Sequence, residues 1–204
     1  MPYRINEVFY SLQGEGVRAG TPNVFVRFSG CNLECSQDEG PKSPGGFDCD
    51  TEFMSGRTVS LEQLLQEIHE AAPECHNVIL TGGEPGLQWD LNLSRALRQR
   101  ERPYFVAIET NGSIQVPAPV DWVTVSPKVA EHAIRQKLAD EVKYVRDVGQ
   151  AIPRPACKAD HYLISPAFTS DGVKYATLEW CINLVKENPT WRLSMQQHKF
   201  WKVR

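Results

Sequence analysis

The sequence contains no long hydrophobic run. Its longest apolar runs, such as residues 24–26 and 78–80, fall far short of the ~20 residues that a membrane-spanning helix needs. Glu7 stands where a secretory signal peptide would have an apolar stretch. We therefore expect a cytoplasmic protein with no membrane partner.

The chain also has no marked excess of charge of either sign. Its 204 residues include 22 basic and 25 acidic side chains, which gives a formal net charge of −3. This balance excludes a broadly cationic nucleic-acid binder and a long acidic tail, so we expect no nucleic-acid partner. The length predicts a single domain over residues 1–204 with a core of its own.

Cysteine is too scarce for a disulfide scaffold, since the chain has 6 in all. Cys31, Cys35 and Cys49 nevertheless stand close together, which indicates metal binding. A closed zinc site would need a further protein ligand. An iron–sulfur cluster held by these thiolates alone would leave an iron open to a small molecule. The spacing by itself leaves an iron–sulfur cluster, a zinc site and unliganded thiols as alternatives.

Strand-like and helix-like segments alternate along the chain. Ser60 and Gln63 fit a capping box at the start of an amphipathic helix. Asp90 fits the N-cap of a second helix, and residues 171–188 predict a long third helix that Pro189 stops. Strand composition is found at residues 6–12, 23–29, 77–81, 104–110, 122–126, 141–146, 161–165 and 192–195. This alternation predicts a parallel α/β fold, open or partly barrelled.

Two segments stand out from this pattern. Residues 36–48 contain two prolines, three glycines and hardly any apolar side chain, so we expect an excursion there, in a loop that reaches about residue 57. TGGEP (81–85) directly follows a predicted strand, and its paired glycines allow a ligand to approach the backbone closely. Glu84 is placed to accept hydrogen bonds there. A plain strand-to-helix turn is the alternative, and the upstream cysteines favour the functional interpretation.

Taken together, these motifs resemble the radical S-adenosylmethionine enzymes and, within them, the 7-carboxy-7-deazaguanine synthases. The resemblance is carried in order by LQGEG (12–16), VRFSGCNLEC (26–35), CDTEF (49–53), TGGEP (81–85), IETNG (108–112), VSPK (125–128), EVK (141–143) and RLSMQQHK (192–199). The chain departs from the usual CxxxCxxC spacing, because 13 residues separate Cys35 from Cys49. We interpret residues 36–48 as an insertion. The resemblance implies a partial (β/α) barrel of the radical S-adenosylmethionine type, reduced in helices.

The resemblance also implies the cofactors. It implies a [4Fe–4S] cluster on Cys31, Cys35 and Cys49, S-adenosylmethionine at the open iron, and Mg²⁺ on Thr51. The implied S-adenosylmethionine contacts are Asp48, Cys49, Asp50, Gly83, Ser126, Pro127, Lys128, Ser165, Pro166, Ala167 and Phe168. The two Ser-Pro pairs among them have a simpler explanation, since Ser-Pro commonly ends a strand.

The implied substrate is 6-carboxy-5,6,7,8-tetrahydropterin, which the family converts to 7-carboxy-7-deazaguanine with loss of ammonia. The implied substrate contacts are Leu12, Gln13, Gly14, Glu15, Arg27, Thr81, Glu109, His198 and Arg204. A substrate carboxylate calls for a guanidinium, which Arg27 would supply, and Glu15 or Glu109 would accept from the ring. Without the resemblance, Arg27 is a surface arginine on a strand and His198 belongs to a solvated basic end.

Partners and competing functions follow from the same resemblance. It implies a homodimer and an electron donor such as a flavodoxin. A glycyl-radical-enzyme activase would share the cysteine loop and the GGEP turn, but it would act on a protein, and LQGEG, SPK and QQHK argue against it. A non-enzymatic zinc-binding module is the other alternative.

The chain end (191–204) is expected to deliver His198 and to fold over the substrate, or else to be a packed terminal segment only.

We predict that Cys31, Cys35 and Cys49 are the only cluster ligands. Alanine at each of these positions should abolish cluster assembly, measured as iron and sulfide per chain after anaerobic reconstitution. Alanine at Cys75, Cys157 or Cys181 should leave the cluster intact, because these cysteines lie far from the group in sequence. Cys181 also lies on a predicted helix among apolar side chains, which indicates a packing role. A complete cluster in the Cys35 variant, or zinc without sulfide in the wild type, would refute this ligand set.

Overall fold

The computed structural model describes residues 2–33, 35, 52–169 and 172–204. The insertion at residues 36–48 lies outside the described residues. The same holds for the predictions that concern Asp48, Cys49, Asp50 and Thr51.

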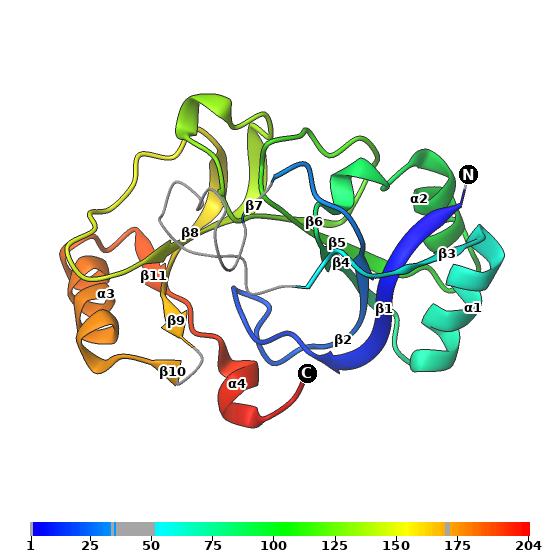
Figure 1. Ribbon diagram of the computed structural model, residues 1–204, viewed down its shortest axis with the longest axis horizontal. Coiled ribbons are helices and arrows are strands. Elements are labelled where there is room, and N and C mark those ends of the chain that lie inside the picture. The colour runs from blue at the N-terminus through cyan, green and yellow to red at the C-terminus, as the bar shows by residue number, and fades with distance from the viewer. Residues whose placement is uncertain (1, 34, 36–51, 170–171) are drawn as a thin grey trace.

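One curved, mostly parallel sheet dominates the structure (Figure 1). Its nine strands follow the order β11-β8-β7-β6-β5-β4-β2-β1-β3. All of them are parallel except β1, which runs antiparallel to both β2 and β3. The bounds are β1 (Tyr3–Leu12), β2 (Pro22–Phe28), β3 (Arg57–Val59), β4 (Asn77–Gly82), β5 (Phe105–Thr110), β6 (Trp122–Val125), β7 (Leu138–Arg146), β8 (Lys158–Pro166) and β11 (Trp191–Leu193). The predicted parallel α/β fold is confirmed.

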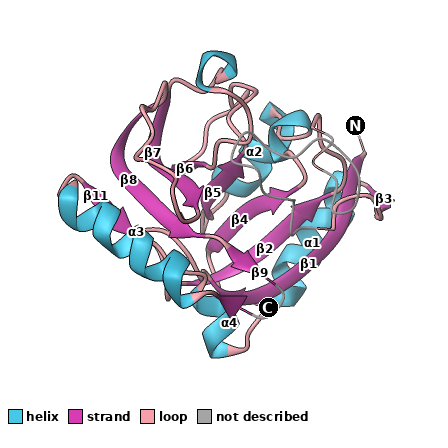
Figure 2. Cartoon of the chain, turned by 60° about the vertical axis from the view of Figure 1, so that its left-hand side comes forward, coloured by secondary structure: helices cyan, strands magenta, loops and turns pink. Residues whose placement is uncertain are grey.

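Few helices accompany the sheet. They are α1 (Leu61–Ala71), α2 (Leu91–Arg98), α3 (Tyr175–Glu187) and α4 (Gln197–Trp201), with 3₁₀ turns η1 (Pro85–Leu87) and η2 (Glu131–Ala133). The first two cover the outside of the sheet near β1 and β4, and α3 covers it near β8 and β11 (Figures 1 and 2). No helix in the described ranges is long and apolar enough to cross a membrane.

Local signals set the starts of the first two helices as predicted. The Ser60 hydroxyl accepts from the Gln63 amide at 3.2 Å, and the Gln63 side chain accepts from the Ser60 amide at 2.8 Å. Asp90 accepts from the Leu93 amide at 2.9 Å. Both caps satisfy helix amides that lack an intrahelical partner, which fixes where each helix begins.

The prediction for the third helix was wrong at its start, because α3 begins at Tyr175. Gly172–Val173 form the short strand β10, which pairs with β9 (Phe168–Thr169). Gly172 has φ +105°, a conformation that no right-handed helix contains. The expected loop also ends in a strand, since β3 pairs with Tyr3–Ile5. Three residues are too few to show a strand periodicity in sequence.

The three scattered cysteines belong to the core. Cys157 and Cys181 pack inside a cluster with Val142, Ile164 and Trp191 between the sheet and α3. Burial raises the pKa of each of these two thiols to about 11, which disfavours the thiolate that a metal needs. The predicted packing role of Cys181 is thereby confirmed.

The concave side of the sheet is built in layers, because side chains alternate between its two faces. Phe9, Phe25, Ile79 and Ala107 meet through the register pairs of β1, β2, β4 and β5 and form an apolar floor. Phe9 and Phe25 stack with ring centroids 5.1 Å apart. One step along the same face, a second layer is polar and holds Glu7, Arg27, Thr81, Glu109, Thr124 and Glu141. The polar layer therefore lies directly above an apolar floor.

Candidate active site

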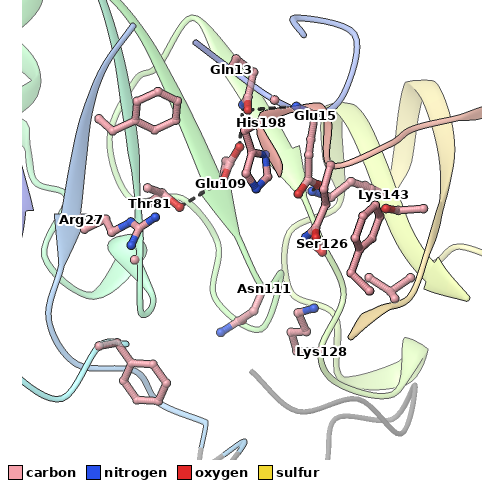
Figure 3. A pocket seen from close by; sticks show the side chains of 18 of the residues that line it. Gln13, Glu15, Arg27, Thr81, Glu109, Asn111, Ser126, Lys128, Lys143 and His198 are labelled. Carbon is pink, nitrogen blue, oxygen red and sulfur yellow. Dashed lines mark hydrogen bonds and ion pairs between the residues drawn. The ribbon is translucent and has the colours of Figure 1, made fainter. Parts of the chain in front are cut away.

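A cavity of about 400 Å³ occupies the concave side of the sheet. It extends from the turn after β1 to the segments that follow β5, β6 and β8 (Figure 3). Ligand sites of parallel sheets form at the carboxyl ends of the strands, where loops converge, and the turn after the antiparallel β1 reaches this pocket from the opposite edge.

Nearly every predicted site residue in the described part of the chain lines this cavity. The lining residues among them are Leu12, Gln13, Gly14, Glu15, Arg27, Cys31, Cys35, Thr81, Gly83, Glu109, Ser126, Lys128, Ser165, Pro166, Ala167, Phe168, His198 and Arg204. Pro127 is the exception among the described residues. Eighteen positions from distant parts of the sequence thus share one pocket.

The glycine pair at the end of β4 allows two backbones to touch. The Gly83 amide donates to the Phe28 carbonyl, and the Glu84 amide to the Gly30 carbonyl, both at 3.0 Å. A Cβ on Gly82 would lie 2.4 Å from the Phe28 oxygen, and one on Gly83 would lie 1.9 Å from the Gly30 oxygen. Only glycine fits at either position. The turn therefore holds the segment that leads into Cys31.

Glu84 acts as an acceptor, as the sequence indicated, and it is fully buried. Its carboxylate accepts from the Thr110 hydroxyl at 2.8 Å, the Asn111 amide at 2.8 Å and the Gly86 amide at 2.9 Å. Burial raises the pKa of Glu84, and the three hydrogen bonds oppose that rise. Glu84 thus ties the end of β4 to the end of β5.

The cluster side of the pocket provides hydrogen bonds to sulfur. Cys31 Sγ accepts from the Leu33 amide at 3.4 Å and from Asn111 Nδ2 at 3.8 Å. N–H donors to thiolate sulfur are a common feature around iron–sulfur clusters and tune their potential. Within the described ranges no three metal-ligating side chains stand together. The residues present, Cys31 and Cys35 in one pocket, fit two of the three expected thiolates.

Glu109 links three elements at the deep end of the pocket. Gln13 Nε2 donates to its Oε1 at 2.8 Å, and the Thr81 hydroxyl donates to its Oε2 at 3.1 Å. Residues of β4 and β5 therefore fix the side chain of Gln13, which belongs to the turn after β1 (Figure 3).

An arginine pair shares one acid on another side of the pocket. Arg27 Nη1 lies 3.0 Å from Glu7 Oε1, and Arg204 Nη2 pairs with Glu7 Oε2. Both guanidinium carbons lie over the Phe9 ring, at 5.2 and 4.8 Å from its centroid. Two cations against one carboxylate leave one positive charge to attract an anion.

Sequence reasoning assigned no role to Glu7, Asn111 or Lys143. The last two stood inside the motifs IETNG and EVK, which carried the resemblance. Glu7 alternates with Phe9 on a predicted strand, so a shared face was available as a signal.

The chain end bridges two sides of the sheet (Figure 1). Toward β1, the Gln197 amide donates to the Gly14 carbonyl at 2.9 Å, and the Ser11 hydroxyl donates to the Arg204 carbonyl at 2.7 Å. Toward β9, the Phe200 ring meets the Phe168 ring edge-on at 6.1 Å. The α4 segment, which sequence reasoning did not predict as a helix, places His198 and Arg204 at the pocket.

Comparison with known proteins places the chain among cluster-binding proteins. Residues 12–113 match the family model of a 4Fe-4S single cluster domain. The chain is 37% identical to 7-carboxy-7-deazaguanine synthase of Bacteroides thetaiotaomicron over the whole of both chains. It is 36% identical to the protein of that name from Burkholderia multivorans, again over the whole of both. The crystal structure of QueE from Escherichia coli superposes with a TM-score of 0.68 at 27% identity, and covers 97% of this chain and 95% of that one.

We predict that Glu84→Ala lowers the free energy of unfolding by about 2–4 kcal/mol, because it leaves buried hydrogen-bond donors without an acceptor. Glu84→Gln should lower the free energy of unfolding by less. Its side-chain oxygen still accepts from Thr110 and Gly86, and only the Asn111 N–H loses its acceptor, because it faces the amide group. Urea unfolding of the cluster-free protein measures both. Glu74→Ala is the control, because that side chain is 89% exposed. Equal midpoints for Glu84→Ala and Glu74→Ala would refute the role.

Proposed function

The chain belongs to the 7-carboxy-7-deazaguanine synthase family, and we propose that the pocket described above is where this activity takes place. The protein is a radical S-adenosylmethionine lyase that converts 6-carboxy-5,6,7,8-tetrahydropterin to 7-carboxy-7-deazaguanine and ammonia, in queuosine-type 7-deazapurine biosynthesis. One observation carries the assignment of the pocket. Arg27 lies across the pocket from Glu15, with Glu109 between them (Figure 3), and Arg204, Cys31 and Cys35 line the same pocket.

The cofactors are a [4Fe–4S] cluster and S-adenosylmethionine, which when bound supply a radical that removes a hydrogen atom from the substrate. Cys31 and Cys35 are proposed as cluster ligands together with Cys49. The S-adenosylmethionine contacts are proposed at Gly83, at residues 126–128 and at residues 165–168, with residues 48–50 beside the cluster. Most of the described members of this set line the pocket, which supports the proposal.

The protein's own residues bind and orient the pterin. Arg27 and Arg204 take the substrate carboxylate, because a planar guanidinium matches a carboxylate geometrically and Glu7 neutralises one of the two charges. Glu15 and Glu109 accept from the amino and N–H groups of the ring. Thr81 and the segment Leu12–Gly14 complete these contacts.

His198 closes the pocket from the chain end. Its ring packs against Gly14, where an added Cβ would meet Nδ1 at 2.1 Å. The closed pocket excludes water and shields a reactive intermediate.

Three further proposals rest on the family resemblance. Thr51 ligates Mg²⁺, a hard cation that prefers oxygen ligands, and the substrate carboxylate adds to a hydroxyl too weak to hold it alone. A flavodoxin-type donor supplies the electron. The enzyme works as a cytoplasmic homodimer.

We expect the reconstituted enzyme, with S-adenosylmethionine, reductant and Mg²⁺, to form 7-carboxy-7-deazaguanine and ammonia over many turnovers. Mass spectrometry of the product tests this, and 5′-deoxyadenosine without product would contradict it.

Arg27→Met should raise the KM for substrate by about 100-fold through loss of a charged hydrogen bond. Arg102→Met, at a 67% exposed side chain, is the control. Thr51→Ala should remove the response to Mg²⁺ and keep the cluster.

Deleting residues 200–204 should weaken substrate binding by at least about 10-fold, since it removes the Arg204–Glu7 pair and the Phe200–Phe168 contact. Cluster content and slow, uncoupled cleavage of S-adenosylmethionine should be unchanged. Steady-state kinetics and iron analysis provide the measurement. A truncated enzyme with wild-type kinetics would mean that the chain end is packing only.

A further inference from the structure

The EVK motif (141–143) has no role in the function described so far. Glu141 and Lys143 lie two residues apart on β7, so both side chains face the inside of the curved sheet. Both approach the turn that follows β1. Charged side chains are rarely buried unless they are paired, which makes this pair of contacts informative.

Glu141 holds the backbone of that turn. Its carboxylate accepts from the Val17 amide at 2.8 Å and from the Thr124 hydroxyl at 2.8 Å, and the residue is 3% exposed. A Cβ on Gly16 would lie 2.3 Å from its Oε1, so the turn packs directly on the carboxylate. Glu141 is engaged with the protein itself and does not line the pocket wall.

Lys143 holds a side chain of the same turn. Its ammonium pairs with Glu15 Oε2, and the two side chains are 12% and 14% exposed. Burial disfavours the charge on Lys143, but Glu15, Glu109 and Glu141 outweigh that effect and raise its pKa. The lysine therefore stays cationic throughout the working pH range and keeps a partner for the Glu15 carboxylate.

Glu15 keeps acceptor capacity for a ligand. A carboxylate has several lone pairs, and the lysine contact engages only Oε2. Glu15 and Lys143 both line the cavity, on the side opposite Arg27, and Glu109 lies between the two sides (Figure 3). The pocket thus presents a cation for a carboxylate at one side and oriented acceptors at the other.

We propose that Lys143 is a positioning residue that fixes the Glu15 carboxylate, so that the pocket selects a heterocycle carrying N–H donors. For a pterin these donors are the 2-amino group and the adjacent ring N–H. The inference rests on the proposed function, because it concerns the same pocket and the same class of substrate.

The test compares two substrates on the cluster-loaded enzyme: 6-carboxytetrahydropterin, and the analogue in which oxygen replaces the 2-amino group. In Lys143→Met the KM for the amino substrate should rise by about 10- to 100-fold, since Glu15 loses its orientation. The KM for the analogue should change by less than about 3-fold, so the preference between the two substrates shrinks. Lys143→Arg should restore part of the preference for the amino substrate. Lys158→Met, which removes an exposed lysine of β8, should behave like wild type.

Equilibrium dialysis of both compounds against the cluster-free protein gives a second readout that does not depend on turnover. Because Lys143→Met leaves a buried carboxylate without its cation, the double variant Glu15→Gln, Lys143→Met guards against misfolding. It should fold and show the same loss of preference. An equal rise in KM for both compounds, or lower stability with unchanged preference, would overturn the inference. Absence of pterin turnover by the wild type would instead overturn the proposed function.

Discussion

The buried carboxylate of Glu84 is the interaction on which the arrangement of the site depends. It gathers donors from the segment that ends β5, while its own backbone amide donates to Gly30. Cys31, the first cysteine of the cluster motif, is therefore held next to Asn111, whose side-chain amide donates to its sulfur. A carboxylate is suited to this task because it accepts several hydrogen bonds at once. The two glycines before it make the close approach sterically possible.

The topology explains why residues from so many motifs meet. Parallel strands in sequential order bring their carboxyl ends to one edge, where Cys31, Ser126 and Ser165 line the pocket. The antiparallel strand β1 ends at the opposite edge, because Leu12 pairs with Pro22 at the start of β2. The turn after β1 consequently enters the inside of the sheet from below and reaches Glu109 and Lys143. The pocket thus has a deep end at Glu109 and Lys143 and a second end at the loops that follow the parallel strands.

Sequence reasoning succeeded where the determinant is local. Ser60 and Asp90 act within a few residues, and the helix caps that they form were predicted correctly. It failed at a short strand pairing that no residue pattern indicates and at contacts between distant residues. The β9–β10 pairing shortens α3, and the Glu7–Arg204 pair joins residues 197 positions apart. The candidate site residues were predicted from motifs, whereas the partners that hold them, such as Glu7 for Arg27 and Lys143 for Glu15, depend on strand register, which alternation along one strand does not determine.

On each side of the pocket, charged groups of one sign outnumber their counter-ions. On one side two arginines share Glu7, so a single positive charge remains for a bound carboxylate. On the other side one lysine stands among Glu15, Glu109 and Glu141, so negative charge remains for N–H donors. Each internal counter-ion orients its partner before a ligand arrives, which lowers the cost of ordering on binding. A ligand with an anionic carboxylate at one end and a donor-rich ring at the other complements both sides at once, whereas a ligand with only one of these features leaves a charged group of the pocket without its counterpart. This makes recognition depend on both ends of the substrate together.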